Sequence, residues 1–172
     1  MRGVRSAPLF WFFDVSHDET GELKRSFSRP AKPPGHDVAS FWCQDMKTEF
    51  LAKAKENLTA TQVCFDNGLF NACANRTYYS ALQAAIAALA HKGIRRDKID
   101  HAQVRADFSG ELIKRRKIYP SKLKSCLYDM QIARNQADYS GEPVSRKTAS
   151  RRLAKLQEMF GCIEKEISDD KF

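Results

Sequence analysis

The segment 69–91 constrains the fold most, because apolar residues occupy nearly every side of a helix drawn through its first 21 positions, 69–89. A helix that is apolar all round has to be covered by neighbours on several sides. Gly93 follows the segment and suits a helix end. No alternation of apolar and polar residues predicts a competing strand elsewhere. The chain is therefore predicted to be all-α, with this segment as its central helix.

Four further segments show helical spacing of apolar residues. The first spans 46–65 and is closed by Asp-Asn-Gly at 66–68. The third follows a capping Asp100, the fourth starts with Pro120 in its first turn and ends near Tyr139, and the fifth follows a capping Ser145. The inward positions of the fifth are Ala149, Leu153, Leu156, Phe160, Ile163 and Ile167. We expect an up-and-down bundle of four to five helices.

Residues 1–45 differ from the rest and are predicted to be an irregular extension before a helical domain at 46–172. They hold four of the six prolines, and the segment 29–35 cannot form a helix. The aromatic run 9–13 is too short to span a membrane, and Asp14 ends it before any signal-peptide core. We therefore expect a cytoplasmic protein with no membrane span. Either Met46 is the native start, or the extension is a real tail whose aromatic cluster packs on the bundle.

Metal and cofactor chemistry find no support in the sequence. The five cysteines, Cys43, Cys64, Cys73, Cys126 and Cys162, lack the paired spacing of zinc or redox sites. We expect them to be reduced residues of the helical core. The four histidines are scattered, and no phosphate-binding loop is present. No metal or cofactor is expected.

The formal charge of +8 lies entirely in residues 46–172, because basic and acidic residues balance in 1–45. Two basic clusters supply most of it, one at 92–98 and 114–117 and the other at 146–155. Such clusters suit phosphate contacts. The candidate nucleic-acid-binding residues are Arg115, Arg116, Arg151 and Arg152. The alternative is that both clusters are solvated helix faces.

Arg134 lies on the apolar stripe of the fourth helix, four residues after Met130 and seven after Leu127. A guanidinium remains charged and is almost never fully buried without a partner. Asp138, four residues on, is the obvious partner. The alternative is a cleft in which the charge of Arg134 is used.

The central helix carries a polar stripe of Arg76, Ser80 and Gln83, with Tyr78 and Tyr79 beside it. Unsatisfied buried polar groups cost about 1–3 kcal/mol, so this stripe needs partners. We expect it to pack against the Arg134 face. The tyrosines are either core residues or place one hydroxyl near Arg134.

Two short blocks resemble the HEPN domain, a higher-eukaryote and prokaryote nucleotide-binding domain. The first is Asn-Arg-Thr-Tyr-Tyr-Ser-Ala at 75–81, and the second is Arg-Asn-Gln-Ala-Asp-Tyr at 134–139. His101 lies between them and Val144-Ser145 follows, so that the resemblance covers about 46–167. It is closest to small stand-alone prokaryotic members.

The resemblance implies an all-α bundle of four to five helices that forms a homodimer. Many such proteins are metal-independent ribonucleases in toxin–antitoxin or defence systems, and others are inert partners of a nucleotidyltransferase. The active motif is Arg, four to six residues, then His. Arg134 and Asn135 match its start, but Tyr139, Ser140 and Gly141 stand where the His is expected.

Two hypotheses follow. In the first, the protein is RNA-associated, Arg134 stabilises charge on a phosphate, and Asn135 and Gln83 position it. His101, Asp138 or Tyr139 would then replace the missing His in proton transfer. In the second, the protein is a non-catalytic helical partner of a nucleotidyltransferase, antitoxin or other protein, and Arg76 and Arg134 are structural.

Overall fold

The computed structural model describes residues 13–17, 23–27, 38–94, 96 and 99–169. The chain forms two compact units, Met1–Val38 and Ala39–Phe172, each described by itself. The proline-rich segment 29–35 and most of the aromatic run lie outside the described residues, so the expectations for them stay predictions.

A two-stranded antiparallel sheet occupies the first unit. Strand β1, Phe13–His17, pairs with β2, Leu23–Phe27, and its register places Phe13 opposite Phe27. The extension that the sequence predicts to be irregular therefore contains a hairpin that was not expected. The first four residues of β1, Phe-Asp-Val-Ser, do alternate apolar and polar side chains, but β2, Leu-Lys-Arg-Ser-Phe, shows no such pattern that would have predicted the pair.

The second unit is helical throughout its regular elements. It comprises α1 Val38–Asp66, α2 Phe70–His91, α3 His101–Asp107, a π-helical segment Phe108–Arg115, a 3-10 turn Ser121–Leu123, α4 Cys126–Tyr139 and α5 Arg146–Asp169. The all-α prediction is confirmed for this unit, although α1 begins at Val38, upstream of the expected Met46. Among the described helices, none is long and apolar enough to cross a membrane.

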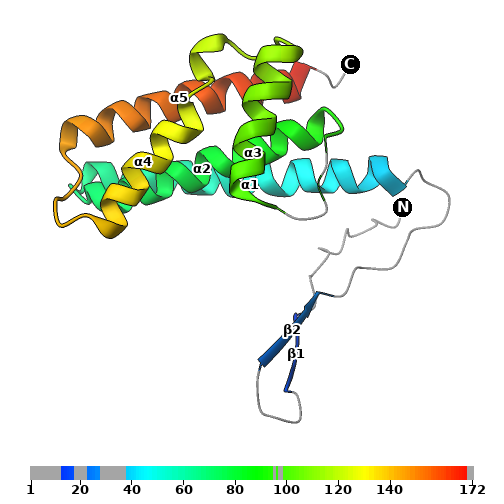
Figure 1. The fold of residues 1–172 in the computed structure, drawn as a ribbon, viewed down its shortest axis with the longest axis horizontal. Coiled ribbons are helices and arrows are strands. Elements are labelled where there is room, and N and C mark those ends of the chain that lie inside the picture. The colour runs from blue at the N-terminus through cyan, green and yellow to red at the C-terminus, as the bar shows by residue number, and fades with distance from the viewer. Residues whose placement is uncertain (1–12, 18–22, 28–37, 95, 97–98, 170–172) are drawn as a thin grey trace, which may run out of the picture. The chain divides into compact units, whose positions relative to one another are not determined.

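Helix α2 lies at the centre of the bundle, as its apolar surface predicts (Figure 1). It packs against α3, α4 and α5, and the Ser80 hydroxyl donates a hydrogen bond of 2.7 Å to the backbone oxygen of Ala54 in α1. The largest fully buried side chains of the bundle are Phe108, Leu112, Leu123, Met130, Leu156, Met159 and Ile163. These side chains come from the π-helical segment, the 3-10 turn, α4 and α5, so the core joins the later elements around α2.

The helix ends follow local sequence signals. Gly68 and Gly93 adopt positive φ values of 74° and 73°, and they end the turns after α1 and α2. The Asp100 carboxylate accepts a hydrogen bond of 2.8 Å from the backbone N–H of Gln103, and the Ser145 hydroxyl accepts one of 3.2 Å from Thr148. Both predicted caps are confirmed.

The segment between α3 and α4 differs from the prediction. The third helix continues as a π-helix through Gly110 to Arg115, and Pro120 precedes the 3-10 turn rather than lying in the first turn of α4. A π-helix shifts the hydrogen bonds by one residue, which side-chain periodicity does not reveal. The inward residues predicted for α5 are all buried, so its apolar stripe is confirmed.

Four cysteines, Cys64, Cys73, Cys126 and Cys162, are free thiols in the described part of the chain. Burial raises the pKa of Cys126 to about 12, which keeps its thiol protonated. Cys73 and Cys126 are buried, as the prediction of core residues requires, whereas Cys64 and Cys162 are only partly buried.

Candidate functional site

Arg134 and Asp138 form an ion pair at the end of α4, as their spacing predicts. Nε of Arg134 lies 2.7 Å from Oδ2 of Asp138. The contact is ionic rather than a well-aligned hydrogen bond, because the buried Nε–H finds no acceptor in good geometry. The two side chains are 25% and 24% exposed, so the pair lies at the edge of the bundle and not in its core.

Asn75 of α2 completes this arrangement from the neighbouring helix. Its side-chain Nδ2 donates a hydrogen bond of 2.8 Å to Oδ1 of Asp138. One carboxylate is thus held by a guanidinium from α4 and by an amide from α2. The two sequence blocks 75–81 and 134–139 meet at this carboxylate.

Two further side chains surround the Arg134 guanidinium. It donates a hydrogen bond of 3.3 Å to Oδ1 of Asn135, and its centre lies 5.4 Å from the ring centroid of Tyr139. Burial lowers the pKa of Arg134, but a hydrogen bond with Tyr139 and the charge of Asp138 outweigh it and leave the pKa raised. Arg134 is therefore a permanent cation in a partly hydrated setting.

The polar stripe of α2 divides between two neighbours. Arg76 points toward α1, where it donates a hydrogen bond of 3.3 Å to Oδ1 of Asn57, and Asn57 donates one of 2.9 Å to Gln83. Ser80 is fully buried and bonded to the backbone of α1. The stripe was expected to pack against the Arg134 face, but these three residues pack toward α1 instead.

Tyr79 connects the two arginines. The Arg76 guanidinium lies 5.6 Å from the centroid of the Tyr79 ring, and Tyr79 also interacts electrostatically with Arg134. Its side chain is partly buried against the core. Tyr79 therefore contacts the guanidinium of Arg76 from its own helix and interacts electrostatically with Arg134 of α4.

Tyr78 and His101 form a separate contact. Tyr78 is buried in the core, as one of its two interpretations predicts, and its hydroxyl lies 3.3 Å from Nδ1 of His101. Their rings meet edge to face at 6.0 Å. Within the described residues, no hydrogen bond or ion pair links His101 to Arg134, so the structure does not bring the two together.

Asn57 is the residue of this region that sequence reasoning missed. It lies three residues after the buried Ala54 and four before the buried Thr61, so it shares the inward side of α1. The sequence signal that could have identified Asn57 is its polar amide at an inward position of α1 among apolar residues. Its two hydrogen-bond partners on α2 could not be inferred from one helix alone.

The predicted nucleic-acid-binding arginines differ in their charge compensation. Arg115 lies 2.6 Å from Glu111, and Arg152 lies 3.6 Å from Asp129. Arg116 donates a hydrogen bond of 3.1 Å to the backbone oxygen of Lys92, and Arg151 is exposed. Neither Arg116 nor Arg151 has an ion pair in the described part of the chain. Arg116 and Arg151 are thus the better candidates for external phosphates.

Helix α4 also carries an exposed apolar stripe. Tyr128, Ile132 and Tyr139 are 60%, 48% and 77% exposed, and the exposed Asn135 falls on the same line. Their spacings of four, three and four residues place them on one helical face. This face borders the Arg134–Asp138 pair. The inward stripe dominates the apolar pattern of this helix, so the exposed stripe was not predicted.

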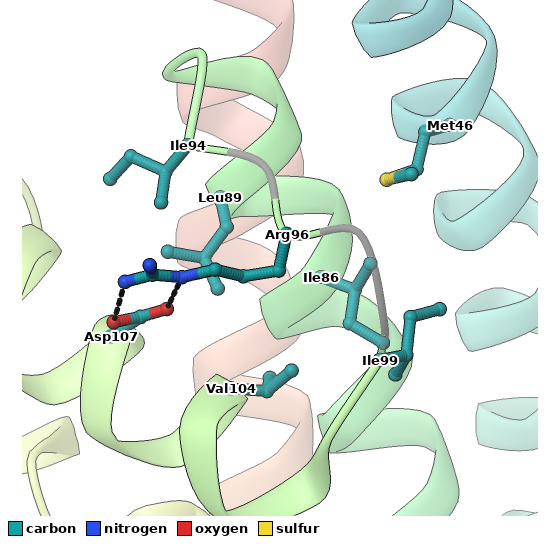
Figure 2. Close-up of a pocket in the computed structure, with 8 residues that line it drawn as sticks. All are labelled: Met46, Ile86, Leu89, Ile94, Arg96, Ile99, Val104 and Asp107. Carbon is teal, nitrogen blue, oxygen red and sulfur yellow. Dashed lines mark hydrogen bonds and ion pairs between the residues drawn. The ribbon is translucent and has the colours of Figure 1, made fainter.

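A small recess lies on another side of the bundle, between α2 and α3 (Figure 2). It is lined mainly by apolar side chains, Met46, Ile86, Leu89, Ile94, Ile99 and Val104, and by the Arg96–Asp107 pair. Arg96 donates to both carboxylate oxygens of Asp107, at 2.9 and 3.0 Å. This ion pair links residue 96, just before α3, to the end of that helix. The volume of the recess, about 30 Å³, is far below the roughly 300–1,000 Å³ of ligand pockets.

The described residues contain no group of three or more side chains that could hold a metal ion. The candidate sites are the Arg134 region, which comprises Asn75, Arg134, Asn135, Asp138 and Tyr139, and the basic faces that carry Arg116 and Arg151. Both can act on an anion by charge and hydrogen bonding alone.

Comparison with known proteins identifies one matching family. The model of the HEPN domain family matches residues 48–166, which include every residue of the Arg134 region. No curated protein matches the chain.

Proposed function

Because the chain belongs to the HEPN family, we propose that it is an RNA-associated HEPN protein of a toxin–antitoxin or defence-type system. In this proposal the Arg134 region binds RNA phosphates. The observation that carries it is the carboxylate of Asp138, which is held by Arg134 and Asn75 from two helices. Donors that hold a carboxylate can also hold a phosphate oxygen.

Charge and accessibility support the same function. The guanidinium of Arg76 lies 5.6 Å from the Tyr79 ring, that of Arg134 lies 5.4 Å from the Tyr139 ring, and Tyr139 is 77% exposed. Guanidinium groups contact phosphates, and exposed aromatic rings can stack with unpaired bases. Arg116 and Arg151 add uncompensated positive charge elsewhere on the bundle. An RNA strand would thus find both charge and a stacking surface.

The proposal does not include ribonuclease activity. Cleavage of the RNA backbone requires a group that accepts the proton of the attacking ribose hydroxyl. The expected His is missing from the Arg134 motif, and His101 is engaged with Tyr78. Asp138 and Tyr139 are poor substitutes for an imidazole near neutral pH. We therefore propose RNA binding without metal-independent cleavage.

We also propose that the protein acts as a homodimer. The apolar stripe Tyr128, Ile132 and Tyr139 supports a two-fold contact, since a C2 interface uses the same patch on both subunits. The stripe borders the Arg134–Asp138 pair, so a dimer would bring two such regions near one another. Large exposed apolar side chains in one line are typical of an interaction surface.

The same stripe favours a second candidate function. A helical partner protein, such as a nucleotidyltransferase or an antitoxin, could cover it by laying an apolar helix face against α4. In that case Arg134 and Asp138 would form part of a protein interface, and RNA would not bind there. The two candidates differ in whether RNA affinity depends on Arg134.

The test is RNA binding in the presence of a chelator. Fluorescence anisotropy with a labelled single-stranded oligouridylate should give an affinity that falls at least tenfold in Arg134→Ala. Lys165→Ala, an exposed control on α5, should remain within about twofold of wild type. Wild-type binding that Arg134→Ala leaves unchanged would contradict the proposed function. Release of shortened RNA by wild type, lost in Arg134→Ala, would show that catalysis is retained.

A further inference from the structure

We infer that Asp138 is an internal competitor for the anion site formed by Arg134 and Asn75, and that RNA phosphate binds there by displacing its carboxylate. This inference rests on the proposed function. It assigns to Asp138 a role in setting affinity rather than in proton transfer.

The carboxylate of Asp138 occupies a place in which the oxygens of another anion could be held. Oδ2 of Asp138 lies 2.7 Å from Arg134 Nε, and Oδ1 accepts a hydrogen bond of 2.8 Å from Asn75 Nδ2. The two donors come from different helices, Arg134 from α4 and Asn75 from α2. A carboxylate and a phosphate offer the same kind of anionic oxygen to such donors.

Asp138 is poorly placed to stabilise its own helix. It stands in the last turn of α4, which ends at Tyr139 and has no basic residue there. A carboxylate at a helix C-terminus opposes the helix dipole. The order Arg134 before Asp138 is also the weaker arrangement for an ion pair four residues apart. Helix stability is therefore a weak explanation for an acid at this position.

The contact is also open to exchange. Both side chains are about a quarter exposed, and the buried Arg134 Nε–H lacks a well-aligned acceptor. Asp138 precedes the end of α4 by one residue, where backbone hydrogen bonds are fewest. Because the Nε atom itself is buried, a phosphate oxygen could reach it only after the carboxylate has moved away, and the position of Asp138 at the helix end allows that movement.

The consequence is a threshold for binding. While Asp138 occupies the site, it neutralises Arg134, and once displaced it repels a neighbouring phosphate. RNA binds only when the free energy of its contacts with the protein exceeds the cost of displacing Asp138 and of its repulsion. Removing the charge of Asp138 should therefore strengthen RNA binding, whereas loss of a residue that helps to bind or cleave RNA would weaken its function.

The decisive variant is Asp138→Asn, which keeps the size and the acceptor oxygen but removes the charge. Anisotropy with a single-stranded oligouridylate at low salt should show about threefold to fivefold tighter binding than wild type. Glu142→Gln, an exposed residue in the next turn, removes the same net charge and should change affinity little. The double variant Arg134→Gln, Asp138→Asn lacks the guanidinium and should not bind RNA more tightly than wild type.

Three outcomes would overturn the inference while leaving the proposed function intact. Asp138→Asn could bind no better than wild type, Glu142→Gln could gain as much, or the gain could persist in the double variant. The proposed function would still stand if Arg134→Ala weakens the RNA binding of the wild-type protein. Absence of RNA binding in wild type and in Asp138→Asn would overturn both proposals. Thermal melting of each variant shows that the compared proteins are folded.

Discussion

Asn75 donates a hydrogen bond to Asp138 across 63 positions of sequence, and this contact joins α2 to the last turn of α4. It is the point at which the two HEPN-like sequence blocks meet. Arg134 binds the other oxygen of the same carboxylate. The family resemblance and the candidate site therefore coincide in one small cluster of side chains.

Loss of Arg134 should cost the fold little. The Arg134–Asp138 pair is about a quarter exposed, and Asp138 keeps its bond to Asn75 when the guanidinium is removed. We expect Arg134→Ala to lower the unfolding free energy by about 1 kcal/mol, rather than the roughly 3–5 kcal/mol of a broken buried pair. Differential scanning calorimetry should show a melting temperature lower by about 2–4 °C. A fall of more than 10 °C would indicate a purely structural arginine.

The basic faces should differ in their contribution to salt dependence. Reversing the charges of Arg116 and Arg151 to Glu should flatten the log–log dependence of RNA affinity on salt, by about 0.7 for each phosphate that the protein no longer neutralises. Reversing Arg115 and Arg152, which already pair with Glu111 and Asp129, changes net charge equally and should flatten it less. Equal slopes for the two double variants would mean that internal pairing does not decide which arginines meet RNA.

The exposed stripe of α4 should control assembly. We expect light scattering to give a dimer mass for wild type at micromolar concentration and a monomer mass for the double variant Tyr128→Glu, Ile132→Glu. Val63→Glu introduces a charge at a comparably exposed apolar residue of α1 and should leave the dimer intact. A monomeric wild type at every concentration, or a dimeric double variant, would remove the stripe from the interface.

Low pH should reduce the contribution of the Arg96–Asp107 pair to the unfolding free energy, because it protonates Asp107. The hydrogen bonds from Arg96, opposed in part by burial, hold the pKa of Asp107 below its usual range. A carboxylate with a lowered folded-state pKa stabilises the fold above its unfolded pKa, near 4, and loses that contribution as pH falls through the folded pKa. Asp107→Asn should therefore lower the unfolding free energy by roughly 1–2 kcal/mol at pH 7. In urea titrations, the difference from wild type should shrink below pH 4, and a constant difference would contradict this account.

Much of the bundle could be predicted from periodicity, because a helix repeats its faces every few residues. The inward stripe of α5 and the caps Asp100 and Ser145 follow from local patterns of this kind. The hydrogen-bond register of the π-helical segment leaves no comparable pattern in the sequence, and of the two short strands only β1 alternates apolar and polar residues.

The sequence predicted the residues of the candidate site better than it predicted the contacts between them. The pair Arg134–Asp138 follows from a spacing of four residues along one helix. The pair Glu111–Arg115 has the same spacing and could have been predicted in the same way. Contacts between helices depend on how the helices are rotated against each other. For this reason Arg76 was assigned to the Arg134 face although it bonds to Asn57 of α1.

The most direct test of the account is NMR spectroscopy of the arginine Nε–H groups during titration with a single-stranded oligouridylate. Arg134→Lys assigns the Arg134 resonance. RNA binding at this site predicts that this resonance shifts and saturates at the concentrations that saturate anisotropy. An Arg134 resonance that stays fixed while those of Arg116 and Arg151 shift would contradict the central claim, because RNA would then bind the basic faces alone.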